Sequence, residues 1–207
     1  GEDWGRIFWQ MTGEVNVRNA AMALLATVLA LDLDQPNAEI IDALQGFMGI
    51  KRRQETLAEA GGLLVMEDFA HHPTALAGTL ASFRNRFPDR RLVACFEPRS
   101  NTATTNIFQK DFTNALIHAD EVLLGAVHRA EKITRDQRLD TDKMVHDLMD
   151  CGCLAHAFDS NSNLLAHLQH HIDCSSCDPV LVCFFSNGGF DGVPSAFVES
   201  LKVTFPA

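Results

Sequence analysis

The sequence contains no apolar run long enough to cross a membrane. Its most apolar stretch, residues 20–31, has 12 residues, whereas a membrane-spanning helix needs about 18 or more. Arg18 precedes this stretch and Asp32 follows it, so it is interpreted as a buried helix of a folded domain. The first residues, Gly-Glu-Asp, lack the positive charge of a secretory signal. We therefore expect a soluble, cytoplasmic protein with no membrane partner.

Dense basic clusters are also missing. The chain carries 17 Lys and Arg against 27 Asp and Glu, a formal net charge of −10. Such a surface repels phosphate backbones, which argues against a general nucleic-acid partner. The remaining composition, 46% hydrophobic and 21% charged over 207 residues, is that of a globular protein and excludes disorder. The length allows one full domain and part of another.

The six cysteines allow two interpretations. Cys151, Cys153, Cys174 and Cys177 could offer four thiolates to a structural zinc ion. A Cys-x-Cys pair is tighter than the usual Cys-x2-Cys knuckle, however, so we favour ordinary reduced thiols and predict no metal ligands. Cys95 and Cys183 lie inside apolar runs and are expected in the core. A zinc-stabilised interaction domain remains an alternative.

Residues 1–54 are expected to form a mostly helical unit. Residues 6–10 (RIFWQ) suit a short strand. Small and apolar residues over 16–31 predict a helix buried on most sides. A second helix is predicted over 36–48, where Pro36 lies near the first turn and Gly49 follows the end.

Residues 55–207 alternate between apolar runs and helical patterns. Strands are predicted at 62–68, 91–96, 121–125, 155–158 and 179–185, and helices at 73–87, 106–118, 141–151, 161–172 and 194–203. This alternation indicates βαβ units, and therefore an α/β fold: a Rossmann-like, doubly wound, mainly parallel sheet. Ligands of such sheets bind at the carboxyl ends of the strands.

The segment after the first of these strands carries an unusual set of side chains. Asp68 ends the strand, two imidazoles follow, and Pro73 starts a helix. A carboxylate there can accept a ribose hydroxyl, and a phosphate can lie near His72 and the helix start. The plainer interpretation is a helix cap with surface histidines.

Two further loops follow strands. In the first, Arg99 offers a planar fork for a carboxylate, and Ser100 and Asn101 add adaptable hydrogen bonds. In the second, Ser186 and Asn187 precede two glycines that let the backbone approach a ligand. A single loop of this kind is also typical of a solvated turn. Together, on one sheet edge, the three loops predict a binding site.

The helical unit adds two candidate contacts for a nucleotide. Asn16 and Asn19 lie three residues apart on one helical face, where their amides could read an adenine edge or cap the helix. A basic junction follows at Lys51-Arg52-Arg53, which suits either a nucleotide held between two parts or a solvated linker.

These segments, in this order, resemble the Mur ligases, ATP-dependent amide-forming enzymes of bacterial cell-wall synthesis. GEVNVRNA at 13–20 is similar to the family motif G-x-H-N-x-x-N-A, and KRRQE at 51–55 is similar to its interdomain linker. DFAHHPTA at 68–75, FEPRSNT at 96–102 and SNGGF at 186–190 are more specific. The last three resemble family members that join UDP-N-acetylmuramate to the tripeptide L-alanyl-γ-D-glutamyl-meso-diaminopimelate.

The resemblance implies roles for individual residues. ATP phosphorylates the muramate carboxylate in this family, and the incoming amine attacks the acyl phosphate with Mg²⁺ holding charge. The family histidine before the first asparagine is Val15 here, a departure that affects one adenine contact. By motif, the adenine residues are Asn16 and Asn19, the phosphate residues Arg53 and the catalytic His72, the ribose residue Asp68, and the peptide residues Arg99, Ser100, Asn101, Ser186 and Asn187.

The resemblance also implies further domains of the same chain. Residues 1–54 correspond to the end of the central ATPase domain and residues 55–207 to the carboxyl-terminal domain. The sequence has no Gly-Lys followed by Ser or Thr, the triplet of the family P-loop, and the Mg²⁺ ligands are expected mainly elsewhere. We expect these 207 residues to be inactive alone. The alternative is a non-catalytic module that binds a nucleotide or phosphosugar.

Overall fold

The computed structural model describes residues 3–9, 11, 13–172 and 178–204, with side chains to residue 201. The chain divides into two compact units, Gly1–Ile50 and Lys51–Ala207. No helix within the described ranges is long and apolar enough to cross a bilayer.

The described part of the first unit consists of two helices and irregular chain. Helix α1 spans Glu14–Ala30 and α2 spans Ala38–Gln45. Helix α2 begins two residues later than predicted because the Asn37 side chain accepts the backbone N–H of Ile40 at 3.0 Å and so caps the helix there, and it ends three residues earlier, before Gly46.

Two predictions for this unit are wrong. Residues 6–9 form no strand, because no second strand within the described part of the unit offers them ladder partners, and Gln10 lies outside the described residues. The helix over 16–31 is not buried on most sides, since only Ala20 and Val28 of α1 are buried. One short neighbouring helix cannot cover its whole surface.

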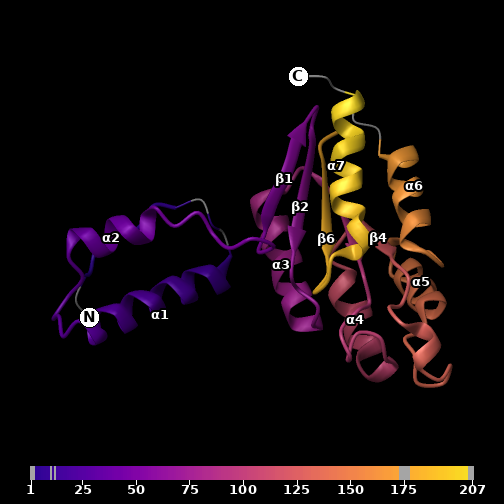
Figure 1. The fold of residues 1–207 in the computed structure, drawn as a ribbon, viewed down its shortest axis with the longest axis horizontal. Helices are drawn as coiled ribbons and strands as arrows, with labels where there is room; N and C mark the ends of the chain where they lie inside the picture. The colour runs from indigo at the N-terminus through magenta and orange to yellow at the C-terminus, as the bar shows by residue number, and fades with distance from the viewer. Residues whose placement is uncertain (1–2, 10, 12, 173–177, 205–207) are drawn as a thin grey trace. The chain divides into compact units, whose positions relative to one another are not determined.

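The second unit contains a six-stranded sheet in the order β1-β2-β6-β3-β4-β5 (Figure 1). All neighbouring pairs are parallel except β1 with β2. The strands are β1 Glu55–Ala60, β2 Leu63–Asp68, β3 Arg91–Phe96, β4 Glu121–Leu124, β5 Leu154–Ala157 and β6 Val180–Phe185. The predicted doubly wound, mainly parallel sheet is confirmed.

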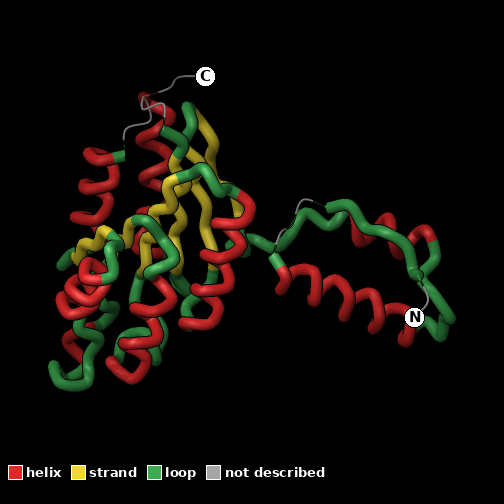
Figure 2. The backbone as a smooth tube through the Cα atoms, turned by 180° about the vertical axis from the view of Figure 1, so that it is seen from behind, coloured by secondary structure: helices red, strands yellow, loops and turns green. Residues whose placement is uncertain are grey.

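Helices cover both faces of this sheet, as the opposite views of Figures 1 and 2 show. Helices α3 (Pro73–Arg86), α4 (Gln109–Leu116) and α5 (Thr141–Asp150) pack on one face, and α6 (Asn161–His171) and α7 (Val193–Thr204) pack on the other. Alternate strand residues point to the two layers: Met66 and Phe96 to the first, Val65 and Cys95 to the second. Cys95 and Cys183 are fully buried, which confirms their predicted place in the core.

Strand β1 was not among the strands predicted from the sequence. Its residues, ETLAEA, are only half-buried and carry two glutamates, as an edge strand does. Gly61 and Gly62 join β1 to β2 and both have positive φ, +55° and +87°. Adjacent glycines between two extended runs are a hairpin signal that could have revealed the strand.

The strand order determines where a site can form. Helices α3, α4 and α5 carry the chain outward along one face, and α6 returns it along the other, so β6 enters between β2 and β3. In register, Phe185 at the end of β6 lies opposite both Asp68 and Phe96. The three predicted loops therefore leave the sheet side by side, at the switch point where such folds bind ligands.

Candidate functional site

Backbone hydrogen bonds continue past the strand ends and hold the three loops together. Ser186 donates its N–H to the carbonyl of Asp68 at 3.2 Å, and Glu97 donates to the carbonyl of Phe185 at 3.0 Å. The predicted convergence of these segments on one rim of the sheet is confirmed by this arrangement.

A buried carboxylate organises the rim. Glu97, directly after β3, is only 1% exposed. The Ser186 hydroxyl donates to its Oε2, and the Asn161 amide donates to its Oε1 at 3.3 Å. Arg99 completes the set with an N–H to Oε1 at 3.3 Å. A charge removed from water in this way is costly unless paired and hydrogen-bonded, and here it is both.

Arg99 lies directly against the loop that follows β6, residues 186–190, which is called the third loop below. A Cβ added to Gly188 would overlap the Arg99 side chain at its Nε and Cδ atoms. The missing side chain at 188 thus makes room for Arg99, whose side chain is 29% exposed and bound to Glu97. Part of its guanidinium surface is available to an anionic ligand, as a carboxylate-binding role requires.

The third loop holds strained backbone and an unpaired polar atom. Phe190 and Asp191 have positive φ, +48° and +49°, a conformation that non-glycine residues adopt rarely and mostly where the surroundings enforce it. Phe190 is buried, and Asp191 accepts a hydrogen bond from Asn161 at 2.8 Å. Asn187 has a buried Oδ1 with no hydrogen-bond partner among the described residues.

Arg52 fastens the start of the second unit to the rim. Its Nε pairs with Glu67 at 2.7 Å, and its Nη2 donates to the carbonyls of Ser186, at 2.7 Å, and Gly188. The backbone carbonyl of Arg52 also accepts the N–H of Phe69 at 2.7 Å. Arg52 therefore positions both the basic junction and the third loop.

Asp68 also makes a hydrogen bond to the backbone next to the basic junction. Its carboxylate is buried and accepts the backbone N–H groups of Ala70, at 2.7 Å, and Gln54, at 2.9 Å. Burial raises its pKa, while these two hydrogen bonds and the nearby Arg53 lower it. This geometry gives Asp68 a positioning role, and the ribose contact stays a prediction.

Arg53 and His72 are the exposed cationic and titratable groups here. The Arg53 guanidinium lies 5.1 Å from the centre of the Phe69 ring. His72 immediately precedes α3, and its ring contacts Phe108 at 5.2 Å between centres. Neither side chain belongs to the group of hydrogen-bonded residues around Glu97. His72 instead lines an open pocket of about 330 Å³ with Thr74, Phe108 and Asp111.

Ser100 and Asn101 shape the loop after Arg99. The Ser100 hydroxyl accepts the N–H of Ala103 at 3.1 Å, and the Asn101 carbonyl accepts the Thr104 hydroxyl at 3.3 Å. The Asn101 side chain is exposed.

The two candidate adenine residues belong to the first unit. Asn16 is half-buried and Asn19 exposed, both in the amino-terminal part of α1. Their helical spacing is confirmed, and their contact with a nucleotide stays a prediction.

Of the four cysteines considered as zinc ligands, the structure describes only Cys151 and Cys153. Cys151 is exposed, whereas Cys153 is buried and donates its thiol to the carbonyl of Ala119 at 3.3 Å. Burial raises the pKa of Cys153 to about 11, so it holds its proton at neutral pH. Cys174 and Cys177 lie outside the described residues.

Residues 52–183 match the family described as the Mur ligase glutamate ligase domain. The chain belongs to the Mur ligase family. It is 41% identical over 125 residues to the UDP-N-acetylmuramate–L-alanyl-gamma-D-glutamyl-meso-2,6-diaminoheptandioate ligase of Escherichia coli (strain K12), covering 60% of this chain and 27% of that one. It is 32% identical over 205 residues to the UDP-N-acetylmuramate–L-alanine ligase of Acidovorax sp. (strain JS42), covering 95% and 41%.

Solved Mur ligases share this fold. The murein peptide ligase of Psychrobacter arcticus 273-4 superposes with a TM-score of 0.68 at 29% identity, over 94% of this chain and 38% of that one. The UDP-N-acetylmuramate-alanine ligase of Thermotoga maritima gives a TM-score of 0.73 at 23% identity, over 96% and 40%. This chain thus spans well under half the length of these relatives.

Several residues of the rim had no role predicted from the sequence. Glu97 could have been found, because a carboxylate directly after five consecutive apolar strand residues is a recognisable signal. Arg52 was included in the basic junction, but no separate role was predicted for it. Asn161 gave no signal, since it comes 64 residues after the carboxylate that it contacts.

Proposed function

We propose that this chain is the carboxyl-terminal part of an ATP-dependent ligase that joins L-alanyl-γ-D-glutamyl-meso-diaminopimelate to UDP-N-acetylmuramate in cell-wall peptide recycling. The observation that carries the proposal is Arg99, held on buried Glu97 and seated over Gly188 at the switch point of the sheet. The Escherichia coli relative, whose name states this substrate pair, supports it.

Each group at the rim has a distinct part in peptide binding. Arg99 meets a carboxylate of the tripeptide, since its guanidinium is planar, charged and partly exposed. The unpaired Oδ1 of Asn187 accepts an N–H of the peptide. Glu97 and Ser186 do not need to touch substrate, because they are buried and fix the positions of Arg99 and the third loop.

Fewer residues of this chain support the proposed binding of ATP. ATP supplies the phosphoryl group that activates the muramate carboxylate. Arg53 and His72 are exposed near Asp68 and the start of α3, so their positive or polar atoms suit phosphate oxygens. Mg²⁺ ligands are expected mainly outside these residues. Because the sequence contains no P-loop triplet, we expect weak ATP binding and no turnover by these 207 residues alone.

A peptide titration followed by calorimetry or NMR tests the proposal. The tripeptide is expected to bind weakly, and Arg99→Ala to weaken binding by about 10- to 150-fold, the loss of one or two charge-assisted hydrogen bonds of about 1.5–3 kcal/mol. Free L-alanine, titrated in parallel, is expected to bind far more weakly because it offers fewer contacts. Equal binding of both ligands would instead indicate an alanine-adding enzyme, the activity named for the Acidovorax relative.

A pair of glycine variants tests the Arg99 position itself. Gly188→Ala displaces the Arg99 side chain and should reduce peptide affinity about as much as Arg99→Ala. Both variants leave the buried Glu97 without its charged partner, so both should also lower the free energy of unfolding. Gly189→Ala is the matched control, since its Cβ would meet no atom within 4 Å. Unchanged peptide binding in both Arg99→Ala and Gly188→Ala would remove the peptide site from this rim.

A further inference from the structure

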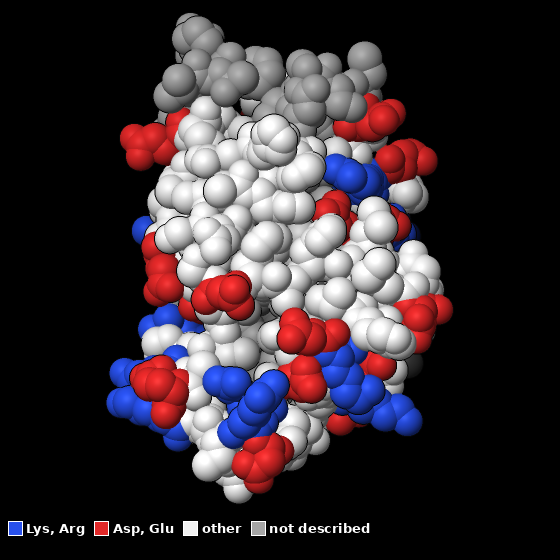
Figure 3. All heavy atoms as spheres, turned by 90° about the vertical axis from the view of Figure 1, so that its right-hand side faces the viewer, with Lys and Arg blue, Asp and Glu red and all other residues white. Residues whose placement is uncertain are grey.

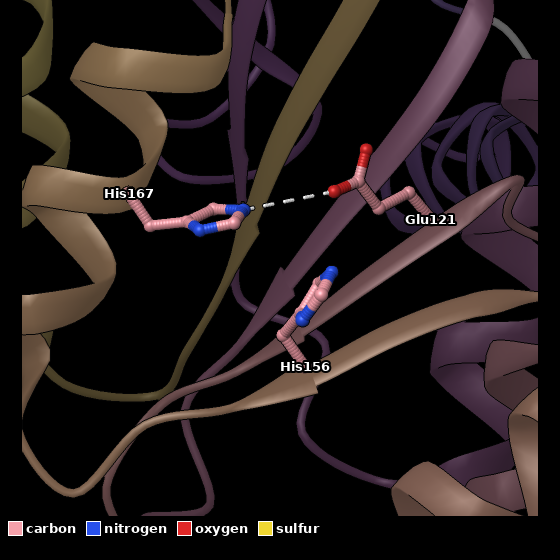
Figure 4. A group of neighbouring side chains, drawn as sticks. All are labelled: Glu121, His156 and His167. Atoms are coloured by element: carbon pink, nitrogen blue, oxygen red, sulfur yellow. Dashed lines mark ion pairs between the residues drawn. The ribbon is translucent and has the colours of Figure 1, made fainter.

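A second group of ligand-type side chains lies away from the rim. The side of the molecule formed by α5 and α6 carries a broad area without charged side chains (Figure 3). In the second unit Glu121, the first residue of β4, lies near His156 of β5 and His167 of α6. Figure 4 shows the three side chains, from three different elements, directed toward one another. The rim, by contrast, lies at the ends of β2, β6 and β3.

The spacing within this group fits a single metal ion. One ligand atom from each residue lies within 4.8 Å of the other two. The His167 Nε2 and the Glu121 Oε1 are 3.9 Å apart, longer than a hydrogen bond. Tetrahedral zinc with ligands at about 2.0–2.1 Å separates neighbouring donor atoms by roughly 3.4 Å. Small rotations, above all of the exposed His156, close that difference.

The chemistry of the donors also suits zinc. Two neutral imidazoles and one carboxylate are typical ligands of Zn²⁺, whereas Mg²⁺ and Ca²⁺ take oxygen. The Glu121 side chain is 9% exposed, and its other oxygen lies 3.5 Å from Arg91, so one oxygen remains directed at the histidines.

A fourth ligand is available on the same helix. His171 lies one turn after His167, and their ring centres are 4.2 Å apart. His171 or a water molecule would complete a tetrahedral site. The apolar ring of Phe158 packs against this group, with its centre 5.1 Å from that of the His167 ring.

We propose that Glu121, His156 and His167 bind one zinc ion that fastens helix α6 to the β4–β5 edge of the sheet. The ion has no part in the ligase reaction. Its role is structural, because it joins a helix of one layer to two strands of the sheet. The proposal does not depend on the peptide or nucleotide assignments.

Zinc titration of the untagged 207-residue chain tests this proposal. Thiols would confuse the result, so binding is measured by calorimetry in a background with serine at positions 151, 174 and 177. We expect one equivalent of Zn²⁺ to bind and to raise the thermal unfolding midpoint. His156→Gln and Glu121→Gln should each weaken binding at least about tenfold. Because His156 is exposed, its variant should fold normally, as circular dichroism can verify.

The exposed His118 supplies the matched control. His118→Gln should leave zinc affinity unchanged. Failure of the serine background to bind zinc would overturn the proposal, and would assign any binding by the parent chain to its thiols. Binding that persists undiminished in His156→Gln and Glu121→Gln would overturn it as well. Neither result would bear on the peptide site, which is measured separately through Arg99.

Discussion

At the scale of single residues, the buried carboxylate of Glu97 is the group on which the rim depends. Three donors from three separate segments converge on it: the Ser186 hydroxyl and the Arg99 guanidinium from two loops, and the Asn161 amide from the first residue of α6. A neutral group of the same shape cannot satisfy all three, because an amide has only one acceptor oxygen.

Glu97→Gln should therefore lower the free energy of unfolding by about 1.5–3 kcal/mol, the value of hydrogen bonds to a charged group. Tripeptide affinity should fall with it, because Arg99 loses the partner that orients it. Urea denaturation measures the first effect and calorimetry the second. Glu59→Gln serves as the control: its side chain is 63% exposed and paired with Arg90, so it should cost at most about 1 kcal/mol. Equal losses of stability in the two variants would show that the hydrogen bonds to Glu97 contribute no more to folding than one exposed ion pair does.

At the scale of elements, two consecutive arginines have different tasks. Arg52 joins Glu67 at the end of β2 to the loop after β6 through three side-chain hydrogen bonds. Arg53 is exposed and stacks over Phe69. The first couples elements of the fold, and the second is available to a ligand.

Arg52→Ala is expected to reduce the free energy of unfolding by about 1.5–3 kcal/mol, since it leaves Glu67 and two carbonyls without their charged partner. Arg53→Ala should cost about 0.5–1 kcal/mol, the value of an exposed cation–π contact. Chemical denaturation of both variants checks the contrast. If Arg53→Ala were the more destabilising of the two, the assigned roles would be reversed.

At the scale of the whole molecule, the two units differ in how much they bury. The eight residues of α2 include none that is buried, whereas α4, also of eight residues, buries Phe112, Thr113, Ala115 and Leu116. Local stability follows the number of buried apolar contacts.

Hydrogen exchange should reveal this difference directly. Backbone amides of α2 are expected to exchange about 100-fold or more faster than those of α4, which has the same length but lies in the core. Strand β6, buried at all six positions, should show the slowest exchange. NMR or mass spectrometry on the intact chain makes the measurement. Similar protection in α2 and α4 would contradict the inferred inequality between the units.

Local patterns predicted most of the second unit. Arg91–Phe96 was predicted with its observed limits, and the five helices of this unit lie within one to three residues of their predicted ends. These elements have strong periodicity and clear starts and stops. The first unit was harder: RIFWQ has the composition of a strand, but its described residues 6–9 have no partner strand in the described part of the unit, and the apolar α1 lacks enough neighbouring structure to bury it.

The fold class, the family resemblance and the three polar loops could be predicted without coordinates, because they depend on residues that are near one another along the chain. The position of β6 between β2 and β3, which brings Asp68, Glu97 and Ser186 to one rim, could be learned only from the folded molecule. The folded molecule alone placed Asn161 on Glu97, and His156 and His167 beside Glu121. Such contacts join residues tens of positions apart, and the order of the strands, which no local pattern encodes, fixes which of them meet.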